Sequence, residues 1–317
     1  MSVPDDETSL QRLGTKVARH WRWARTEGLA RLIEEDQLDP FDRLSSAARR
    51  WWWRRSQQVT PGSARPVFLV GLQRSGTNML VRGFEASPEF EVHNENDRAA
   101  FERFRLRSDT VVRSIVITSR HRYVLFKPLC DSHRVDELLD NLATPSPGRA
   151  IWAYRSVDGR VRSALAKFGD ANLRVLRDIA EGRGDSCWQA QRLSEENLEL
   201  IRSFDYDTMT PASAAALFWY VRNSLYFELG LNERHDVLLS SYDGLVEDPE
   251  AGTRRLCQFL DFPWSPRLMS HISVRSNGTH ERLELDPFVR GHCDELEKRL
   301  DAALEESSYS PGALDGE

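Results

Sequence analysis

The sequence contains few cysteines, and these lie far apart. Its 317 residues include four, at Cys130, Cys187, Cys257 and Cys293. They form no Cys-x-x-Cys pair, and no group of histidines and cysteines has the spacing of a zinc site. We therefore expect separate thiols in a reduced, cytoplasmic setting, not a disulfide framework or a zinc domain.

Long hydrophobic runs are also missing. The most apolar stretch, AAALFWYV at 214–221, is far too short to cross a bilayer, and MSVPDDETSL at the start lacks the apolar run of a signal peptide. A net charge of −6 argues against a surface built for nucleic acid, so no nucleic-acid partner is expected. With 40% apolar and 29% charged residues, the composition is typical of a soluble globular protein.

The N-terminal part is polar and rich in arginine and glutamate, and we expect a helical extension over 1–60. Its RRWWWRRS stretch at 49–56 places three tryptophans side by side, which cannot all share one helical face. Trp51–Trp53 either pack in part on the main domain or make peripheral contact with a membrane surface. The main domain is expected at 61–305, followed by a flexible tail at 306–317.

From residue 67 onward, apolar strand patterns alternate with helical ones. The VFLVG run at 67–71 is short and continuously apolar, as in a buried parallel strand. Further strands are expected at 90–94, 123–127, 150–155 and 236–242. This alternation predicts an α/β fold, a three-layer sandwich with helices on both faces of a central parallel sheet. We expect the site at the carboxyl ends of the strands, a helical insertion over it at 170–232, and a helix capped by Asn96 that carries Phe104.

A glycine-bounded loop follows the first strand in FLVGLQRSGTNML, residues 68–80. Gly71 and Gly76 are separated by four residues, as in the nucleotide-binding P-loop G-x-x-x-x-G-K-[ST]. Thr77 and Asn78, however, stand where that motif has its lysine and its metal-binding hydroxyl. The loop therefore has the P-loop frame without the residues that bind a triphosphate and Mg²⁺.

A strand, a glycine-rich turn and a helix together aim backbone N–H groups at one point, where the helix dipole adds positive charge. Arg74, Ser75 and Thr77 add donors at the same place. A cradle with an internal arginine suits an anion with less charge than a triphosphate. A phosphosulfate is such a group.

Three motifs resemble those of sulfotransferases that use 3′-phosphoadenosine 5′-phosphosulfate. GLQRSGTNML is similar to that family's loop for the 5′-phosphosulfate, with Gln73 in place of a frequent proline, which makes the loop less rigid. YRSVDGRVRSAL supplies Arg155 and Ser163, which the resemblance assigns to the 3′-phosphate. The segment from LLSSYDGLVEDP to DFPW resembles the one whose tyrosine, here Tyr242, lies near the adenine.

The resemblance implies a P-loop sulfotransferase fold of the type with a glutamate base. It implies that the donor is 3′-phosphoadenosine 5′-phosphosulfate, that the product is adenosine 3′,5′-bisphosphate, and that no metal takes part. It also implies a set of donor-binding residues, Arg74, Ser75, Gly76, Thr77, Asn78, Arg155, Ser163 and Tyr242.

Sulfuryl transfer needs a base for the acceptor hydroxyl. Animal cytosolic members of the family carry a histidine base where FKPLCDS has Leu129. The second strand ends in EVHNENDRAAF, and NENDR resembles the segment that carries the glutamate base of tyrosylprotein sulfotransferases. We therefore expect Glu95 to be the base, with His93 and Asp97 as the alternatives.

Two cations are expected to stabilise charge on the leaving phosphate, Lys127 at the end of the third strand and Arg74 in the loop. Cys130 is not expected to act as a nucleophile, because the family transfers the group directly. His133 is expected to open a helix at the surface.

Two other functions stay open. The chain could be a phosphotransferase that uses ATP and Mg²⁺, with Thr77 and Asp97 on the metal side, or a binding protein with a degenerate fold. No motif identifies the acceptor, which could be a carbohydrate, a lipid, a peptide or a small alcohol. The sequence does not indicate the oligomeric state.

Overall fold

The computed structural model describes residues 52–53, 55–57, 59–184, 187–273 and 282–306. The elements below belong to the unit that spans Trp53–Glu317. Most of the expected extension at 1–60, including Trp51, and all but the first residue of the expected tail at 306–317 lie outside the described residues. Trp53 stacks on His121 with ring centroids 6.0 Å apart. Membrane contact through Trp51–Trp53 stays a prediction.

A five-stranded sheet, parallel throughout, lies at the centre, in the order β2-β5-β1-β6-β7. Its strands are β1 (Arg65–Gly71), β2 (Phe90–His93), β5 (Tyr123–Phe126), β6 (Arg149–Tyr154) and β7 (Val237–Ser241). In the register, Val67 of β1 lies opposite Leu125 of β5 and Arg149 of β6. The expected parallel α/β sheet is confirmed.

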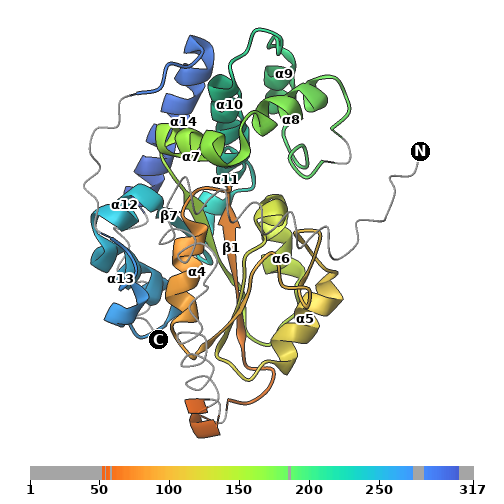
Figure 1. Cartoon of the computed structure of the whole chain (residues 1–317). Helices are drawn as coiled ribbons and strands as arrows, with labels where there is room; N and C mark the ends of the chain where they lie inside the picture. The colour runs from red at the N-terminus through yellow and green to blue at the C-terminus, as the bar shows by residue number, and fades with distance from the viewer. Residues whose placement is uncertain (1–51, 54, 58, 185–186, 274–281, 307–317) are drawn as a thin grey trace, which may run out of the picture. The chain divides into compact units, whose positions relative to one another are not determined.

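Alternate residues of the central strand face two separate cores. Val67 and Leu69 pack in one cluster with α4 (Thr77–Glu85), α12 (Tyr242–Glu247) and α13 (Pro249–Leu260). Phe68 and Val70 pack in the other, with helices that include α5 (Asp109–Thr118), α6 (Val135–Asn141) and α7 (Val157–Phe168). Figure 1 shows α4 and α13 on one side of β1 and α5 and α6 on the other. Because β1 is buried on both faces, it forms the middle layer of the expected three-layer sandwich.

Within 170–232, the described residues form four α-helices, α8 (Ala171–Ala180), α9 (Glu195–Arg202), α10 (Pro211–Asn223) and α11 (Leu225–Glu228). Helix α10 begins where Thr210 accepts a hydrogen bond from the Ser213 amide, and Pro211 takes its first position. It packs against α7, α8 and α14 (Pro287–Glu306). Figure 1 shows α7, α8, α9 and α10 gathered beyond one end of β1, over the ends of the strands that carry the site.

The prediction of a helix from Asn96 through Phe104 is wrong. The chain forms an antiparallel hairpin instead, β3 (Phe101–Glu102) and β4 (Arg105–Leu106). Arg103 and Phe104 make its two-residue loop, both with positive φ, at 49° and 67°. The carboxylate of Asp131 accepts hydrogen bonds from the side chain of Arg105 and the amide of Leu106. These tertiary contacts stabilise the hairpin in place of the helix that the apolar spacing favours.

The remaining short elements are the 3₁₀ helices η1 (Leu129–Arg134), η2 (Leu231–Glu233) and η3 (Pro266–Leu268). Among the described residues, the helices are too short or too polar to span a bilayer.

Candidate active site

Two glycines shape the loop after β1, and neither position accepts a side chain. Gly71 has φ 118°, and a Cβ atom there would lie 2.2 Å from the carbonyl oxygen of Ala153 in β6. Gly76 has φ 83°, and its Cβ would lie 2.3 Å from the ring of Tyr242. The Gly71 amide donates a hydrogen bond to the hydroxyl of Ser132, and this contact fixes the start of the loop. The loop can therefore lie directly against β6 and α12 because both positions lack a side chain.

The donors inside this loop fit an anion. Gly76 is the N-cap of α4 and makes no side-chain cap, so the first amides of the helix keep their donor capacity. Ser75 is 1% exposed, and its hydroxyl has no hydrogen-bond partner among the described residues. Thr77 is buried beside it. A buried hydroxyl without a partner is costly unless a ligand satisfies it. This cradle thus fits the phosphosulfate that the sequence suggests.

Arg74 joins the loop to α7. It takes a left-handed conformation with φ 75°, which is uncommon for a residue with a side chain. Its Nε donates to the Oγ of Ser163 at 2.9 Å. Two residues that the sequence assigns to opposite ends of the donor are therefore in direct contact.

Arg155 follows β6, and its guanidinium lies over the ring of Tyr242, 4.3 Å from the ring centroid. Its carbonyl accepts a hydrogen bond from Trp219 of α10 at 2.9 Å. The same Tyr242 ring covers Gly76, so a cation, an aromatic ring and the anion loop lie together at the carboxyl ends of β1 and β6. An adenine nucleotide needs a stacking surface and a cation for its phosphate, and this corner has both.

Lys127 connects the loop to the expected base. It follows β5, and its Nζ donates to the Oδ1 of Asn78 at 2.6 Å. The same Nζ lies 3.4 Å from the Oε2 of Glu95, and the two side chains are 7% and 17% exposed. Burial raises the pKa of Glu95 although Lys127 opposes the rise, and the nearby charge of Asp131 adds to it. A carboxylate with a raised pKa accepts a proton more readily than an ordinary glutamate.

The two alternative bases, His93 and Asp97, bind each other. His93 Nδ1 lies 2.6 Å from Asp97 Oδ2, and its Nε2 lies 3.4 Å from Glu91. Burial alone would lower the pKa of His93, but the two carboxylates beside its ring nitrogens raise it above its ordinary value. Both ring nitrogens of His93 lie against carboxylates and not toward an acceptor, and so this geometry favours Glu95.

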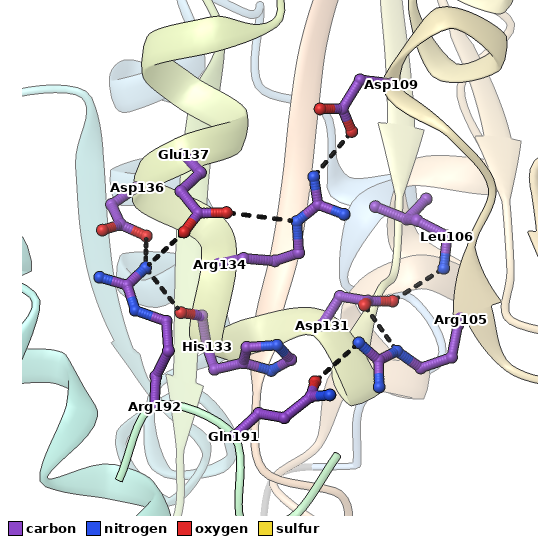
Figure 2. Close-up of polar contacts among 10 residues, drawn as sticks. All are labelled: Arg105, Leu106, Asp109, Asp131, His133, Arg134, Asp136, Glu137, Gln191 and Arg192. Atoms are coloured by element: carbon purple, nitrogen blue, oxygen red, sulfur yellow. Dashed lines mark hydrogen bonds and ion pairs between the residues drawn. The ribbon is translucent and has the colours of Figure 1, made fainter. Parts of the chain in front are cut away.

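A polar network holds the elements next to Glu95. Asp131 is 1% exposed and accepts 2.7 Å hydrogen bonds from Arg105 Nε and the Leu106 amide. Figure 2 shows these contacts, together with the hydrogen bond from Arg105 to Gln191. Beside them it shows a second group around η1 and α6, formed by Asp109, His133, Arg134, Asp136, Glu137 and Arg192. Because Asp131 also raises the pKa of Glu95, the network joins the β3–β4 hairpin to the candidate base.

The expectation that His133 lies at the surface is wrong. The side chain is 5% exposed, and burial together with the surrounding arginines lowers its pKa to about 3. It is therefore a neutral core histidine. Cys130 is likewise buried, and burial raises the pKa of its thiol to about 12. A thiol with that pKa is a poor nucleophile at neutral pH, in line with the expectation for this residue.

Sequence reasoning missed a further buried cation, Arg160 of α7, which is 1% exposed and reaches the carbonyl of Gln73. Gln73 lies in the segment 71–78 after β1, which is called the donor loop below after the sulfuryl donor that the sequence predicts for it. Its position did carry a signal. With Val157, Val161 and Ala164 it forms the i, i+3, i+4, i+7 stripe that a helix buries. An arginine on such a stripe indicates either a helix turned toward solvent or a buried charge, and here the second holds.

Solved structures that the chain matches include sulfotransferases. One from Alicyclobacillus acidocaldarius is 15% identical, with a TM-score of 0.42, and the match covers 79% of this chain and 98% of that one. The sulfotransferase domain of the Synechococcus PCC 7002 olefin synthase is 14% identical, with a TM-score of 0.37 over 79% of this chain and 97% of its own. The sulfotransferase domain of the curacin biosynthetic pathway is 13% identical, with a TM-score of 0.41 over 74% and 98%.

No protein-family model matches the chain, and no curated protein sequence matches it. With TM-scores below 0.5, the matched structures carry no argument about the site.

Proposed function

We propose that this chain is a sulfotransferase, which moves the sulfuryl group of 3′-phosphoadenosine 5′-phosphosulfate to a hydroxyl or amine of an acceptor. The observation that carries the proposal is the position of Lys127. One ammonium group lies 2.6 Å from Asn78 in the donor loop and 3.4 Å from Glu95. A single cation thus touches both the cradle for the leaving group and the candidate base.

The same contact supports transfer without a metal. Asn78 stands where a P-loop has the hydroxyl that binds Mg²⁺. In this chain the Lys127 ammonium, carried by β5, lies against that side chain. A cation from the protein therefore takes the place beside the loop that Mg²⁺ takes in an NTPase.

In the transfer step, the acceptor oxygen forms a bond to sulfur while the bond between sulfur and the bridging phosphate oxygen breaks. The acceptor proton passes to Glu95, and the electron pair of the broken bond stays on the phosphate oxygen. Lys127 and Arg74 stabilise the charge that develops there. Neither residue changes its protonation state in the step.

The other site residues bind the donor and orient it. Amides at the start of α4 and the hydroxyls of Ser75 and Thr77 hold the 5′-phosphosulfate. Arg155 and Ser163 bind the 3′-phosphate, and Tyr242 stacks with the adenine. Ser163 already contacts Arg74, so the side chains that bind the 3′-phosphate and the 5′-phosphosulfate lie in direct contact.

A binding titration with adenosine 3′,5′-bisphosphate in the presence of EDTA tests the proposal, beside a titration with ATP and Mg²⁺. We expect the bisphosphate to bind without metal and ATP not to displace it. A screen with a radiolabelled sulfuryl donor over carbohydrate, lipid, peptide and small-alcohol acceptors then identifies the acceptor class. Magnesium-dependent binding of ATP, with no binding of the bisphosphate, would show a phosphotransferase instead.

A further inference from the structure

Arg160 is a buried cation whose partners are all neutral. Its Nη1 donates to the carbonyl of Ala215 in α10 at 2.9 Å and to the side-chain oxygen of Asn172 in α8 at 3.2 Å. Its Nε lies 3.4 Å from the carbonyl oxygen of Gln73, in the donor loop. The guanidinium also lies 5.5 Å from the ring centroid of Phe218. Within the described part of the chain, no carboxylate pairs with it.

A charge in this position is costly to bury. Ion pairs usually compensate buried arginines, and a buried cation that meets only neutral oxygens stays poorly compensated. The nearest place for a compensating anion is the loop, because Arg160 touches Gln73 and its charge is close enough to that of Arg74 for the two to repel. A phosphosulfate in the cradle would bring the missing negative charge.

The contact with Gln73 also sets the direction in which the backbone N–H group of Arg74 points. The peptide bond between Gln73 and Arg74 is trans, since the described residues contain no cis peptide bond. In a trans peptide the carbonyl and the amide point to opposite sides. A hydrogen bond from Arg160 therefore turns the Gln73 carbonyl toward the interior and the Arg74 amide away from it. It also supports the left-handed conformation of Arg74, which is uncommon for an arginine.

We propose that Arg160 is a positioning residue of the donor loop, which fixes the Gln73–Arg74 peptide and places a buried positive charge behind the phosphosulfate. The loop has Gln73 where the family that it resembles often has a proline. Arg160, which lies in α7, makes the loop rigid in place of that proline. Through Asn172 and Ala215, Arg160 also ties the loop to two helices of the 170–232 segment. This inference rests on the proposed function.

The test compares Arg160→Met and Arg160→Lys with Arg222→Met. Arg222 is a matched control, because it is 3% exposed and donates to backbone carbonyls, those of Gln189 and Gln191, without a contact to the loop. For each protein we would measure the Kd of adenosine 3′,5′-bisphosphate, the KM values of donor and acceptor, kcat, and the thermal unfolding midpoint.

We expect Arg160→Met to weaken nucleotide binding by about 10- to 100-fold, the effect of losing a hydrogen bond from a charged group. The KM of the donor should rise while the KM of the acceptor stays unchanged. Arg160→Lys keeps the charge but cannot reach three oxygens, so it should lie between Arg160→Met and the wild type. Arg222→Met should bind the nucleotide as the wild type does, even where its unfolding midpoint falls.

Each result has one reading. If Arg160→Met and Arg160→Lys both bind the nucleotide within twofold of the wild type, the inference is wrong and the proposed function stands. An equal loss in Arg222→Met also overturns it, because the effect would then reflect general loosening of the core. If Arg160→Met does not fold, Arg160→Lys decides alone. If the wild type itself does not bind the bisphosphate, the proposed function fails first.

Discussion

The carboxylate of Glu95 is the group whose removal tests the chemistry most directly. Glu95→Gln keeps the shape of the side chain and loses the ability to take a proton. A positioned general base contributes about 10²- to 10⁴-fold to a rate, so kcat should fall by that factor. The KM of the donor should change little, because Glu95 lies against Lys127, and it is Lys127 that donates to Asn78 of the donor loop.

The same substitution also has a structural effect that must be separated from the rate. Two unit charges 3.4 Å apart attract each other by on the order of 5 kcal/mol at an effective dielectric near 20. Burial of Glu95 outweighs this attraction, because its pKa is raised in spite of Lys127. Lys127 keeps its 2.6 Å hydrogen bond to Asn78 in the variant, so the ammonium is not left without a partner. We therefore expect a folded protein with an unfolding midpoint close to that of the wild type.

The assay is the initial rate of radiolabelled sulfuryl transfer to an acceptor found in the screen, with bisphosphate binding measured on the same preparations. Asp97→Asn is the matched control, because it removes a carboxylate from the same segment that pairs with His93. Normal nucleotide binding with a lost rate in Glu95→Gln supports the assignment. A rate within threefold of the wild type refutes it, and a large loss in Asp97→Asn alone would move the role to the histidine pair.

The other predictions concern the loop, the network and stability. Gly76→Ala should abolish bisphosphate binding and destabilise the fold by about 1–3 kcal/mol, because it adds backbone strain and a clash with the ring of Tyr242. The control Gly182→Ala, also at positive φ but with open space around it, should keep binding. Equal binding by the two variants would contradict this prediction. Asp131→Asn removes a charge that raises the pKa of Glu95, so the acid limb of the kcat/KM profile should move to lower pH, and a shift to higher pH would oppose the assignment. The raised pKa of His93 means that its ion pairs stabilise the fold fully below its unfolded pKa of about 6.5 and lose this contribution as pH rises through the folded pKa. Urea unfolding of the wild type and His93→Asn should therefore differ more at pH 6 than at pH 9, and a constant difference would refute the claim.

The sequence was sufficient to predict the sheet because buried parallel strands have a simple signature. Each strand is a short apolar run, and each is followed by a turn and a helix. The pattern fails where a tertiary contact competes with it. At Phe101–Leu106 the apolar spacing suits a helix, but the buried carboxylate of Asp131 binds the side chain of Arg105 and the amide of Leu106. A carboxylate 25 residues away in sequence gives no local signal.

The candidate site shows a similar division between what spacing predicts and what it does not. Residues at the ends of neighbouring parallel strands must lie at one edge of the sheet, so Lys127 and Glu95 could be placed together from the sequence. Spacing does not tell which donor meets which acceptor. The resemblance assigns Ser163 with Arg155 to one phosphate, but nothing in the sequence indicates that its hydroxyl accepts a hydrogen bond from Arg74.

Buried charge is the hardest feature to read from a sequence, because the same residue type is usually exposed. Arg160 and Arg222 are both nearly inaccessible, yet their surroundings differ in a way that decides their roles. Arg222 lies over the ring of Trp188 and closes on two carbonyls of one loop, an arrangement that packs a core. Arg160 instead joins three separate elements, and one of them is the anion loop. A buried cation that links the donor loop to the helices over the site can transmit a change in either one to the other. Substitution of Arg160 should therefore uncouple nucleotide affinity from changes in the 170–232 segment.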